Sequence, residues 1–259
     1  MKVVIIGGVA GGATAAARLR RLNEQAEIII FERSGYISYA NCGLPYYIGG
    51  EIERRSALTL QTPASFKDRF NIDVRVNSEV TEIDRMAKQV TVRTAGGTYK
   101  ESYDKLIYCP GAKPIVPEGG NGERFFTLRT VEDTFAIDDF IRANAPRTAV
   151  VCGGGFIGLE AAENLVHRGI SVTLVQGMDQ VLPQIDYDMA CFLHSELRKN
   201  GVKLALSSFV SGLESVEKGI VVHAGGRSFA ADFAIVALGV VSETHLAEQA
   251  GRQLGIKKA

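Results

Sequence analysis

Residues 2–22 read KVVIIGGVAGGATAAARLRRL, and this stretch decides the fold that we expect. The run 2–6, which is apolar after Lys2, is typical of a strand buried on both faces of a parallel sheet. The glycine-rich turn 7–12 and the alanine-rich stretch after it predict a turn that opens directly into a helix. A second apolar strand, 27–31, ends at Glu32. Together these segments predict a strand-helix-strand unit of a doubly wound fold.

The same pattern returns in the second half of the chain. A strand, the turn GGGFIG at 153–158, a helix and a strand follow in the same order over residues 148–175, and Gln176 takes the place of Glu32. The second turn matches the dinucleotide-binding pattern GxGxxG, whereas the first has Val9 where the middle glycine belongs. Two such units predict an α/β fold with two Rossmann-like domains of three layers each.

The two turns are candidate nucleotide sites. Each would offer backbone N–H groups at the positive end of a helix, which is where a pyrophosphate binds. An acid at the end of the second strand accepts hydrogen bonds from ribose hydroxyls, and Glu32 fits that role. Gln176 can still form hydrogen bonds but carries no charge, so the residues leave the choice between NADH and NADPH open. No arginine lies right beside Gln176 to bind a 2′-phosphate, which favours NADH.

The composition argues against several kinds of partner. Lysine and arginine total 29, as do aspartate and glutamate, so the zero net charge speaks against binding to nucleic acid or to an anionic membrane. No apolar run is long enough to span a bilayer and no signal-peptide layout is present, so we expect a cytoplasmic protein. The four cysteines include no CxxC pair and the histidines are scattered, which argues against a disulfide framework or a metal site.

One thiol stands out in the stretch SYANCGLPYY, residues 38–47. Cys42 lies where a short helix is expected to begin, and the positive end of a helix favours a reactive thiolate. A single cysteine is more often a small buried apolar residue, and that is our interpretation of Cys109, Cys152 and Cys191. The glycine turns on either side in the sequence favour the reactive interpretation for Cys42.

Several of these stretches together resemble a known family. They are the turn 7–12, Glu32-Arg33, the stretch 38–47, CPGA at 109–112 and residues 153–160. They resemble the single-cysteine branch of the FAD-dependent pyridine nucleotide-disulfide oxidoreductases, near the coenzyme A-disulfide reductases and the NADH-dependent persulfide reductases. The resemblance implies an NAD(P)-binding domain inserted into an FAD-binding domain. We expect the first part of the FAD domain at 1–112, the NAD(P) domain at 113–236 and a truncated return segment at 237–259.

The resemblance also implies roles for single residues. Cys42 would be the redox nucleophile. Coenzyme A would contact Thr14, Arg18, Arg21, Ser38 and Asn41, although the arginine-bearing helix could also be an ordinary solvated face. FAD would bind the first unit and NAD(P)H the second. The cofactor-binding residues would be Gly7, Gly8, Val9, Ala10, Gly11, Gly12, Glu32, Arg33, Gly111, Gly153, Gly155, Phe156, Ile157, Gly158, Glu160, Gln176 and Gly239.

The implied reaction passes a hydride from NAD(P)H to FAD and electrons on to Cys42, which reduces coenzyme A disulfide or persulfide. Two alternatives stay open: an NADH oxidase or peroxidase that cycles through a sulfenic acid at Cys42, and a nucleotide-binding fragment without activity. The relatives are homodimers and continue past residue 239 with a second flavin segment and a domain that forms the dimer interface. We therefore expect this chain to lack that interface and to hold FAD weakly, because its sheet would keep an open edge.

Overall fold

The computed structural model describes residues 1–120 and 122–255, and the chain folds into two compact units. Of the described residues, the first unit contains Met1–Ala40, Thr59–Lys113 and 242–255; the second contains Asn41–Leu58 and those of Pro114–Val241. The second unit is thus inserted into the first. This arrangement confirms the predicted α/β fold, in which one Rossmann-like domain interrupts the other.

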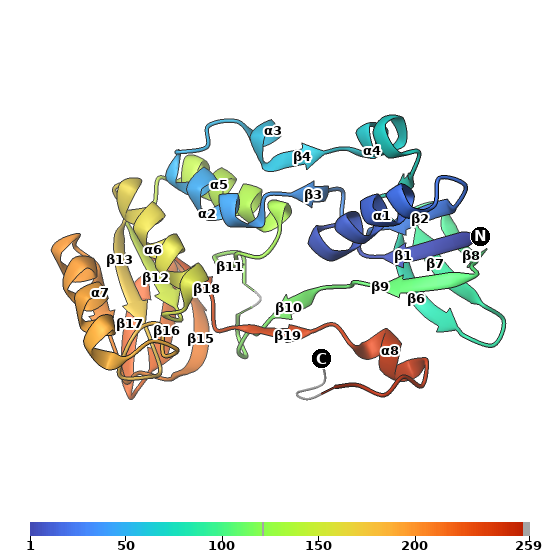
Figure 1. Ribbon diagram of the computed structural model, residues 1–259. Coiled ribbons are helices and arrows are strands. Elements are labelled where there is room, and N and C mark those ends of the chain that lie inside the picture. The colour runs from blue at the N-terminus through green and yellow to red at the C-terminus, as the bar shows by residue number, and fades with distance from the viewer. Residues whose placement is uncertain (121, 256–259) are drawn as a thin grey trace. The chain divides into compact units, whose positions relative to one another are not determined.

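The first unit is built on a parallel sheet in the order β5-β2-β1-β9 (Figure 1). Its strands are β1 (Lys2–Ile6), β2 (Glu27–Phe31), β5 (Asp73–Arg75) and β9 (Lys105–Tyr108). Alternate side chains of β1 point to opposite faces, which is why an unbroken apolar strand is needed: Val3 and Ile5 join one core cluster, and Val4 and Ile6 another. Fully burying one such side chain stabilises the fold by roughly 1.5–3 kcal/mol.

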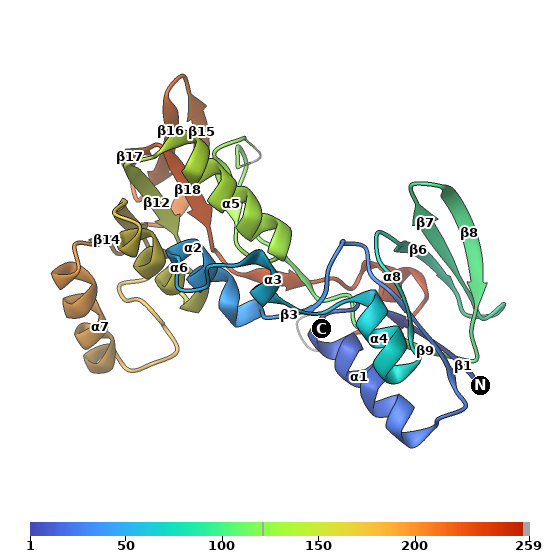
Figure 2. The ribbon, with the colours of Figure 1, turned by 90° about the horizontal axis from the view of Figure 1, so that it is seen from above.

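Different layers cover the two faces of this sheet. Helices α1 (Ala10–Leu22) and α4 (Pro63–Phe70) cover one face, and the antiparallel sheet of β6 (Glu79–Asp84), β7 (Gln89–Thr94) and β8 (Gly97–Ser102) covers the other, as Figure 2 shows. Helix α8 (His245–Gln249) contributes Leu246 to the second core cluster.

The second unit repeats the plan with the sheet order β11-β18-β12-β13-β14. An antiparallel sheet packs on one face through a buried cluster that includes Val150, Cys152, Ile220 and Val222. The helices are α2 (Leu44–Gly49), α5 (Val131–Asn144), α6 (Phe156–His167) and α7 (Tyr187–Lys199). The strands are β11 (Phe125–Thr127), β12 (Thr148–Cys152), β13 (Ser171–Val175), β14 (Lys203–Ala205), β15 (Val210–Val216), β16 (Gly219–Ala224), β17 (Arg227–Ala231) and β18 (Phe233–Val236).

Helix starts follow the capping residues. The Thr130 hydroxyl accepts a hydrogen bond from the Asp133 N–H at 3.1 Å, and the Asp133 carboxylate accepts one from the Thr130 N–H at 3.2 Å. This reciprocal pair is a capping box, with aspartate in the place of the usual glutamate. Helix α5 therefore begins at Val131, directly after the capping threonine.

The remaining elements are short. Strand β3 (Ile37–Tyr39) pairs with β4 (Thr59–Gln61), and β10 (Ala112–Pro114) pairs with β19 (Val240–Ser242). The turn η1 (Asn41–Gly43) and helix α3 (Arg55–Leu58) complete the described chain. Within residues 1–120 and 122–255, no helix has both the length and the apolar character needed to cross a membrane.

Candidate functional site

The first glycine turn requires glycine for two separate reasons. Gly7 has a φ of +95°, and a Cβ there would lie 2.0 Å from the Cys109 carbonyl oxygen. A Cβ on Gly12 would lie 1.8 Å from the Gly7 carbonyl oxygen, so this glycine lets α1 pass close to the turn. Helix α1 begins at Ala10, and its first turn presents N–H groups without intrahelical acceptors. The turn is therefore shaped for a pyrophosphate at the helix N-terminus.

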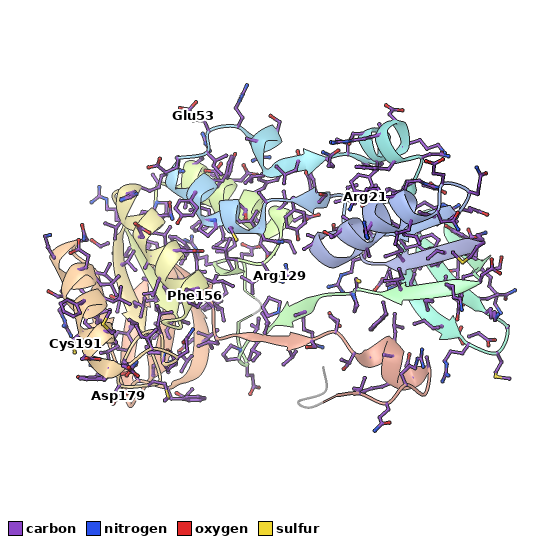
Figure 3. The ribbon with its side chains drawn as sticks, in the orientation of Figure 1. Arg21, Glu53, Arg129, Phe156, Asp179 and Cys191 are labelled. Atoms are coloured by element: carbon purple, nitrogen blue, oxygen red, sulfur yellow. The ribbon has the colours of Figure 1, made fainter. Side chains whose placement is uncertain are left out.

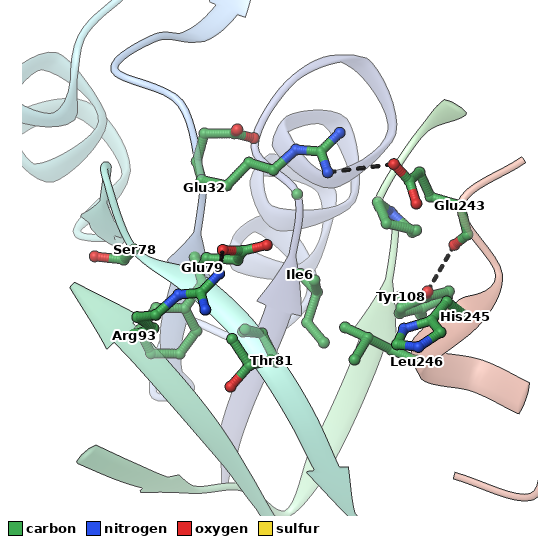
Figure 4. Close-up of a pocket in the computed structure, with 15 residues that line it drawn as sticks. Ile6, Glu32, Ser78, Glu79, Thr81, Arg93, Tyr108, Glu243, His245 and Leu246 are labelled. Atoms are coloured by element: carbon green, nitrogen blue, oxygen red, sulfur yellow. Dashed lines mark hydrogen bonds and ion pairs between the residues drawn. The ribbon is translucent and has the colours of Figure 1, made fainter. Parts of the chain in front are cut away.

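Glu32 is fixed beside this turn. Its carboxylate is buried at the end of β2 and accepts hydrogen bonds from the Gly8 N–H at 2.8 Å and the Ser34 N–H at 2.9 Å. A carboxylate has about four acceptor sites, so two backbone donors leave capacity for ribose hydroxyls. Glu32 also lines a cavity of about 280 Å³ in the first unit (Figure 4). The donor and acceptor set at this cavity fits the adenosine half of a dinucleotide.

The segment before α8 completes this cavity. Arg33 forms an ion pair with Glu243 at 3.3 Å, and the Tyr108 hydroxyl donates to the Glu243 carbonyl at 2.6 Å, as the dashed lines in Figure 4 show. These contacts hold the segment that leads into α8 against the sheet. The further lining residues that the sequence analysis missed include Ser78, Glu79, Thr81, Arg93, His245 and Leu246.

The second glycine turn has the same construction. Gly153 has a φ of +108°, and a Cβ on Gly158 would lie 1.9 Å from the Gly153 carbonyl oxygen. The Gly154 N–H donates to the Gln176 side-chain oxygen at 3.1 Å, just as Gly8 donates to Glu32 in the first unit. The Gln176 amide nitrogen donates to the Gln180 carbonyl at 3.1 Å. The two units therefore share one hydrogen-bond design and differ in the charge at this position.

Three predicted residues lie on the helix that this second turn opens. Phe156 begins α6, where Figure 3 labels it. Its side chain is 61% exposed, and Ile157 beside it is also exposed. Glu160 follows one helical turn later. Burial, with a further contribution from the Glu163 carboxylate, raises the pKa of Glu160 above its ordinary value. Of the other predicted cofactor residues, Gly239 lies in the second unit and Gly111 in the first, and both are exposed.

Cys42 lies in the second unit, in η1 directly before α2, so the short helix expected at this point is present. Its thiol is free and exposed. Helix α2 buries Leu44 and Ile48 and packs against α5 and α6. The approach to α6 is close, because a Cβ on Gly49 would lie 1.9 Å from the Asn164 side-chain oxygen.

A buried carboxylate ties these three helices together. Asp138 of α5 is 1% exposed and forms ion pairs with Arg142 at 2.8 Å and Arg168 at 3.1 Å. The Tyr47 hydroxyl of α2 donates to the same carboxylate at 3.4 Å, and the Arg168 guanidinium also donates to the Ile48 carbonyl at 2.9 Å. The helix that follows Cys42 is therefore held on the second unit by a charged network.

The residues predicted to contact coenzyme A fall into both units. Thr14, Arg18 and Arg21 are exposed on α1, at spacings that place them on one face. Ser38 adopts a φ of +46°, and its N–H donates to the Gly8 carbonyl at 3.1 Å, which brings β3 beside the first glycine turn. A non-glycine residue in this region is uncommon and costs about 1 kcal/mol or more. Asn41 is exposed beside Cys42 in the second unit.

Arg20 has a different role from its neighbours Arg18 and Arg21. Its guanidinium donates to the carbonyls of Phe70 at 2.7 Å and Asn71 at 2.8 Å. Arg20 therefore joins the end of α4 to α1. This structural role differs from both roles considered for the arginines of α1, a solvated face and a substrate site.

The other cysteines differ in their surroundings. Cys152 is buried, and burial raises its pKa to about 12; burial also raises the pKa of the half-buried Cys109. The interpretation of Cys191 as a core residue is wrong, because its side chain is exposed on α7 (Figure 3). The inner face of α7 carries Ala190 and His194 instead. His194 accepts a hydrogen bond from the Val181 N–H at 3.2 Å, so its role is structural.

These differences predict an order of alkylation. Treatment of the folded protein with iodoacetamide at about pH 8 should modify Cys42 and Cys191 first, because both thiols are exposed. Cys152 should react last, since it is buried and its thiolate is strongly disfavoured. Peptide mass spectrometry over a time course measures the order. Modification of Cys152 as fast as that of Cys191 would contradict the described burial.

Two Rossmann-type units, each with a glycine turn and a hydrogen-bonding side chain at the end of the second strand, define a protein that binds two nucleotides. A family model described as pyridine nucleotide-disulphide oxidoreductase matches residues 1–258. The chain belongs to this family, which confirms the resemblance seen in the sequence.

Individual relatives are similar over most of the chain. A coenzyme A disulfide reductase of Staphylococcus aureus strain JH9 is 41% identical over 218 residues, which cover 83% of this chain and 50% of that protein. The structure of reduced Bacillus anthracis CoADR-RHD is 49% identical with a TM-score of 0.94, covering all of this chain and 47% of its own. The structure of an NAD-dependent persulfide reductase from A. fulgidus is 36% identical with a TM-score of 0.95, and the match covers 100% of this chain and 50% of that chain. The chain spans about half the length of the curated relatives it matches.

Proposed function

We propose that this chain carries the nucleotide-binding and thiol-bearing part of an FAD-dependent NAD(P)H:disulfide or persulfide oxidoreductase. The observation that carries the proposal is the position of Cys42. Its exposed thiol directly precedes α2, and α2 packs on α6, the helix that the second glycine turn opens. The named activities of the similar coenzyme A disulfide and persulfide reductases support the same substrate class.

We assign the two nucleotides to the two units. FAD would bind the turn 7–12, with Glu32, Arg33 and Gly111 beside it, in the domain that we place at 1–112 and 237–259. FAD supplies a group that accepts hydride and passes electrons to sulfur, which no protein side chain can do. The buried Glu32 carboxylate lines the cavity and can accept further hydrogen bonds, which supports the binding of FAD at this turn.

NAD(P)H would bind the turn 153–158 in the domain at 113–236, with Phe156, Glu160 and Gln176 among its contacts. NADH is favoured over NADPH. Both ends of the Gln176 side chain are committed to hydrogen bonds within the protein, and residues 177–179 bring an exposed carboxylate at Asp179 and no cation. A 2′-phosphate would therefore meet no complementary charge from this segment.

The thiol chemistry of Cys42 is a disulfide exchange. The Cys42 thiolate attacks one sulfur of coenzyme A disulfide, the sulfur-sulfur bond breaks, and one coenzyme A thiolate leaves. Two electrons and a proton then split the mixed disulfide, which releases the second coenzyme A thiol and restores the Cys42 thiolate. Thr14, Arg18, Arg21, Ser38 and Asn41 are proposed to bind the coenzyme, since exposed guanidinium groups suit its phosphates.

Two wider proposals follow from the resemblance. The whole protein would be a homodimer. It would work in the cytoplasm, where its four free cysteines would stay reduced.

Steady-state rates test the proposed function. Supplied with FAD and NADH, the protein is expected to oxidise NADH with coenzyme A disulfide or persulfide and to release free coenzyme A thiol in proportion. Turnover with hydrogen peroxide alone would favour the oxidase or peroxidase reading, in which Cys42 cycles through a sulfenic acid. Nucleotide binding without turnover on any of these substrates would favour a nucleotide-binding fragment.

The assignment of FAD to the first unit makes a prediction for Glu32. Glu32→Gln removes the charge and one acceptor from the ribose position, and we expect FAD to bind about 10- to 100-fold more weakly. Fluorescence titration with FAD measures the change. Glu27→Gln, at the exposed start of the same strand, is the matched control and should leave FAD affinity unchanged. Equal FAD affinity in Glu32→Gln and its parent would contradict the assignment.

A further inference from the structure

A large aromatic side chain lies in water at the nucleotide end of the second unit. Phe209 is 77% exposed, although its neighbour Val210 begins β15 and is buried. Exposure of so large an apolar surface to water costs free energy. An aromatic ring that is exposed beside a ligand site can therefore bind a flat apolar group by stacking.

The backbone holds Phe209 firmly beside the end of β13. The Ser208 N–H donates to the Gln176 carbonyl at 2.8 Å, and the Ser207 N–H donates to the Met178 carbonyl at 2.8 Å. Ser208 is fully buried, and its hydroxyl accepts a hydrogen bond from Arg227 at 2.5 Å. The segment after β14 is therefore tied to the segment after β13 on both sides of Gly177.

Gly177 has no side chain that could cover the Phe209 ring. A Cβ at this position would lie 3.3 Å from a ring carbon of Phe209, so the ring lies directly over the glycine. Met178, the next residue, is 55% exposed. A polarizable thioether and an aromatic ring thus flank the same short stretch, and both are open to solvent.

The topology indicates where the adenine base of a bound nucleotide would lie. In a Rossmann unit the pyrophosphate lies at the glycine turn and the adenosine ribose at the end of the second strand, which here is Gln176. The strands β12, β13 and β14 are consecutive neighbours in the sheet. A base attached to that ribose extends away from the turn, past Gln176 and towards β14, where the Phe209 segment begins.

We propose that Phe209, together with Met178, forms the stacking surface for the adenine of the pyridine nucleotide. The inference rests on the proposed function, since it takes the second unit as the NAD(P)H site. It names a positioning residue that neither the glycine turn nor the sequence pattern indicates. The ring holds the adenosine half of the nucleotide and makes no contact with the reacting nicotinamide.

Separate affinity measurements for the two halves of the dinucleotide distinguish adenine stacking from a general effect on folding. Calorimetry on the full chain with ADP-ribose, which carries adenine, and with nicotinamide mononucleotide, which does not, gives two dissociation constants. Phe209→Ala should weaken ADP-ribose roughly 5- to 30-fold and leave the mononucleotide within about twofold of the parent. Phe209→Tyr should restore ADP-ribose binding. Phe192→Ala, at a site 72% exposed on α7, is the matched control and should change neither constant.

Other results overturn the proposal. Unchanged ADP-ribose affinity in Phe209→Ala contradicts adenine stacking while the proposed function stands. Equal losses for both halves mean that Phe209 supports the fold rather than the base, and also contradict it. A parent protein that binds neither half overturns the assignment of the second unit, and this inference with it.

Discussion

Replacing Cys42 by serine is expected to abolish reduction of coenzyme A disulfide while leaving nucleotide binding intact. The hydroxyl of serine cannot form or exchange a disulfide, so the exchange step loses its nucleophile. Neither glycine turn includes this position. We expect at least about a thousandfold loss in the rate at which coenzyme A thiol is released from its disulfide, with the affinities for FAD and ADP-ribose unchanged.

Cys191 offers a matched control for that experiment, because it is the other exposed free cysteine. Cys191→Ser should turn over coenzyme A disulfide at the parent rate. A Cys42→Ser variant that keeps more than about a tenth of the parent activity would remove the thiol from the mechanism. Equal losses in the two variants would show that the effect is not specific to Cys42.

Removal of the Asp138 carboxylate should destabilise the second unit by roughly 3–5 kcal/mol. The carboxylate is buried, and Asp138→Ala would leave the Arg168 guanidinium, 22% exposed, without its ion partner. The Tyr47 hydroxyl of α2 would lose its acceptor as well. Urea unfolding measures the loss, and hydrogen exchange of amides in α5 assigns the transition to the second unit.

Arg142 provides the control for this second prediction. It pairs with the same carboxylate, but its side chain is 64% exposed, so Arg142→Ala should cost only about 0–1 kcal/mol. Asp138→Asn keeps two acceptor lone pairs and should fall between these limits. A free energy of unfolding for Asp138→Ala within about 1 kcal/mol of the parent would show that the network does not anchor α2.

Much of the fold was predictable because local patterns and tertiary structure agree. After their charged first residues, the runs 2–6 and 27–31 are apolar, as expected for a sheet covered on both faces, and the structure pairs Lys2 with Glu27 through Ile6 with Phe31. Helices α4 and α7 also begin or end at residues that favour a helix terminus, since Thr62 caps the start of the first and Asn200 follows the end of the second.

The missed features depend on contacts between distant segments. Glu243 and His245 reach the Glu32 cavity from the far end of the chain, and no spacing rule joins them to β2. Arg20 could not be separated from Arg18 and Arg21 by sequence, because its partners are backbone carbonyls after α4. Cys191 lies in an amphipathic helix next to Ala190, which is the small residue that is buried. The sequence pattern did not show which of these two neighbours faces the core.

The central claim is that Cys42 exchanges disulfides with coenzyme A, and the mixed disulfide itself is the most direct test. The protein is incubated with coenzyme A disulfide without NADH, quenched with acid and digested. The mass of each cysteine peptide is then measured by mass spectrometry. The account predicts a coenzyme A adduct on the Cys42 peptide and little or none on the Cys191 peptide, although both thiols are exposed. An unmodified Cys42, or equal modification of both cysteines, would contradict it.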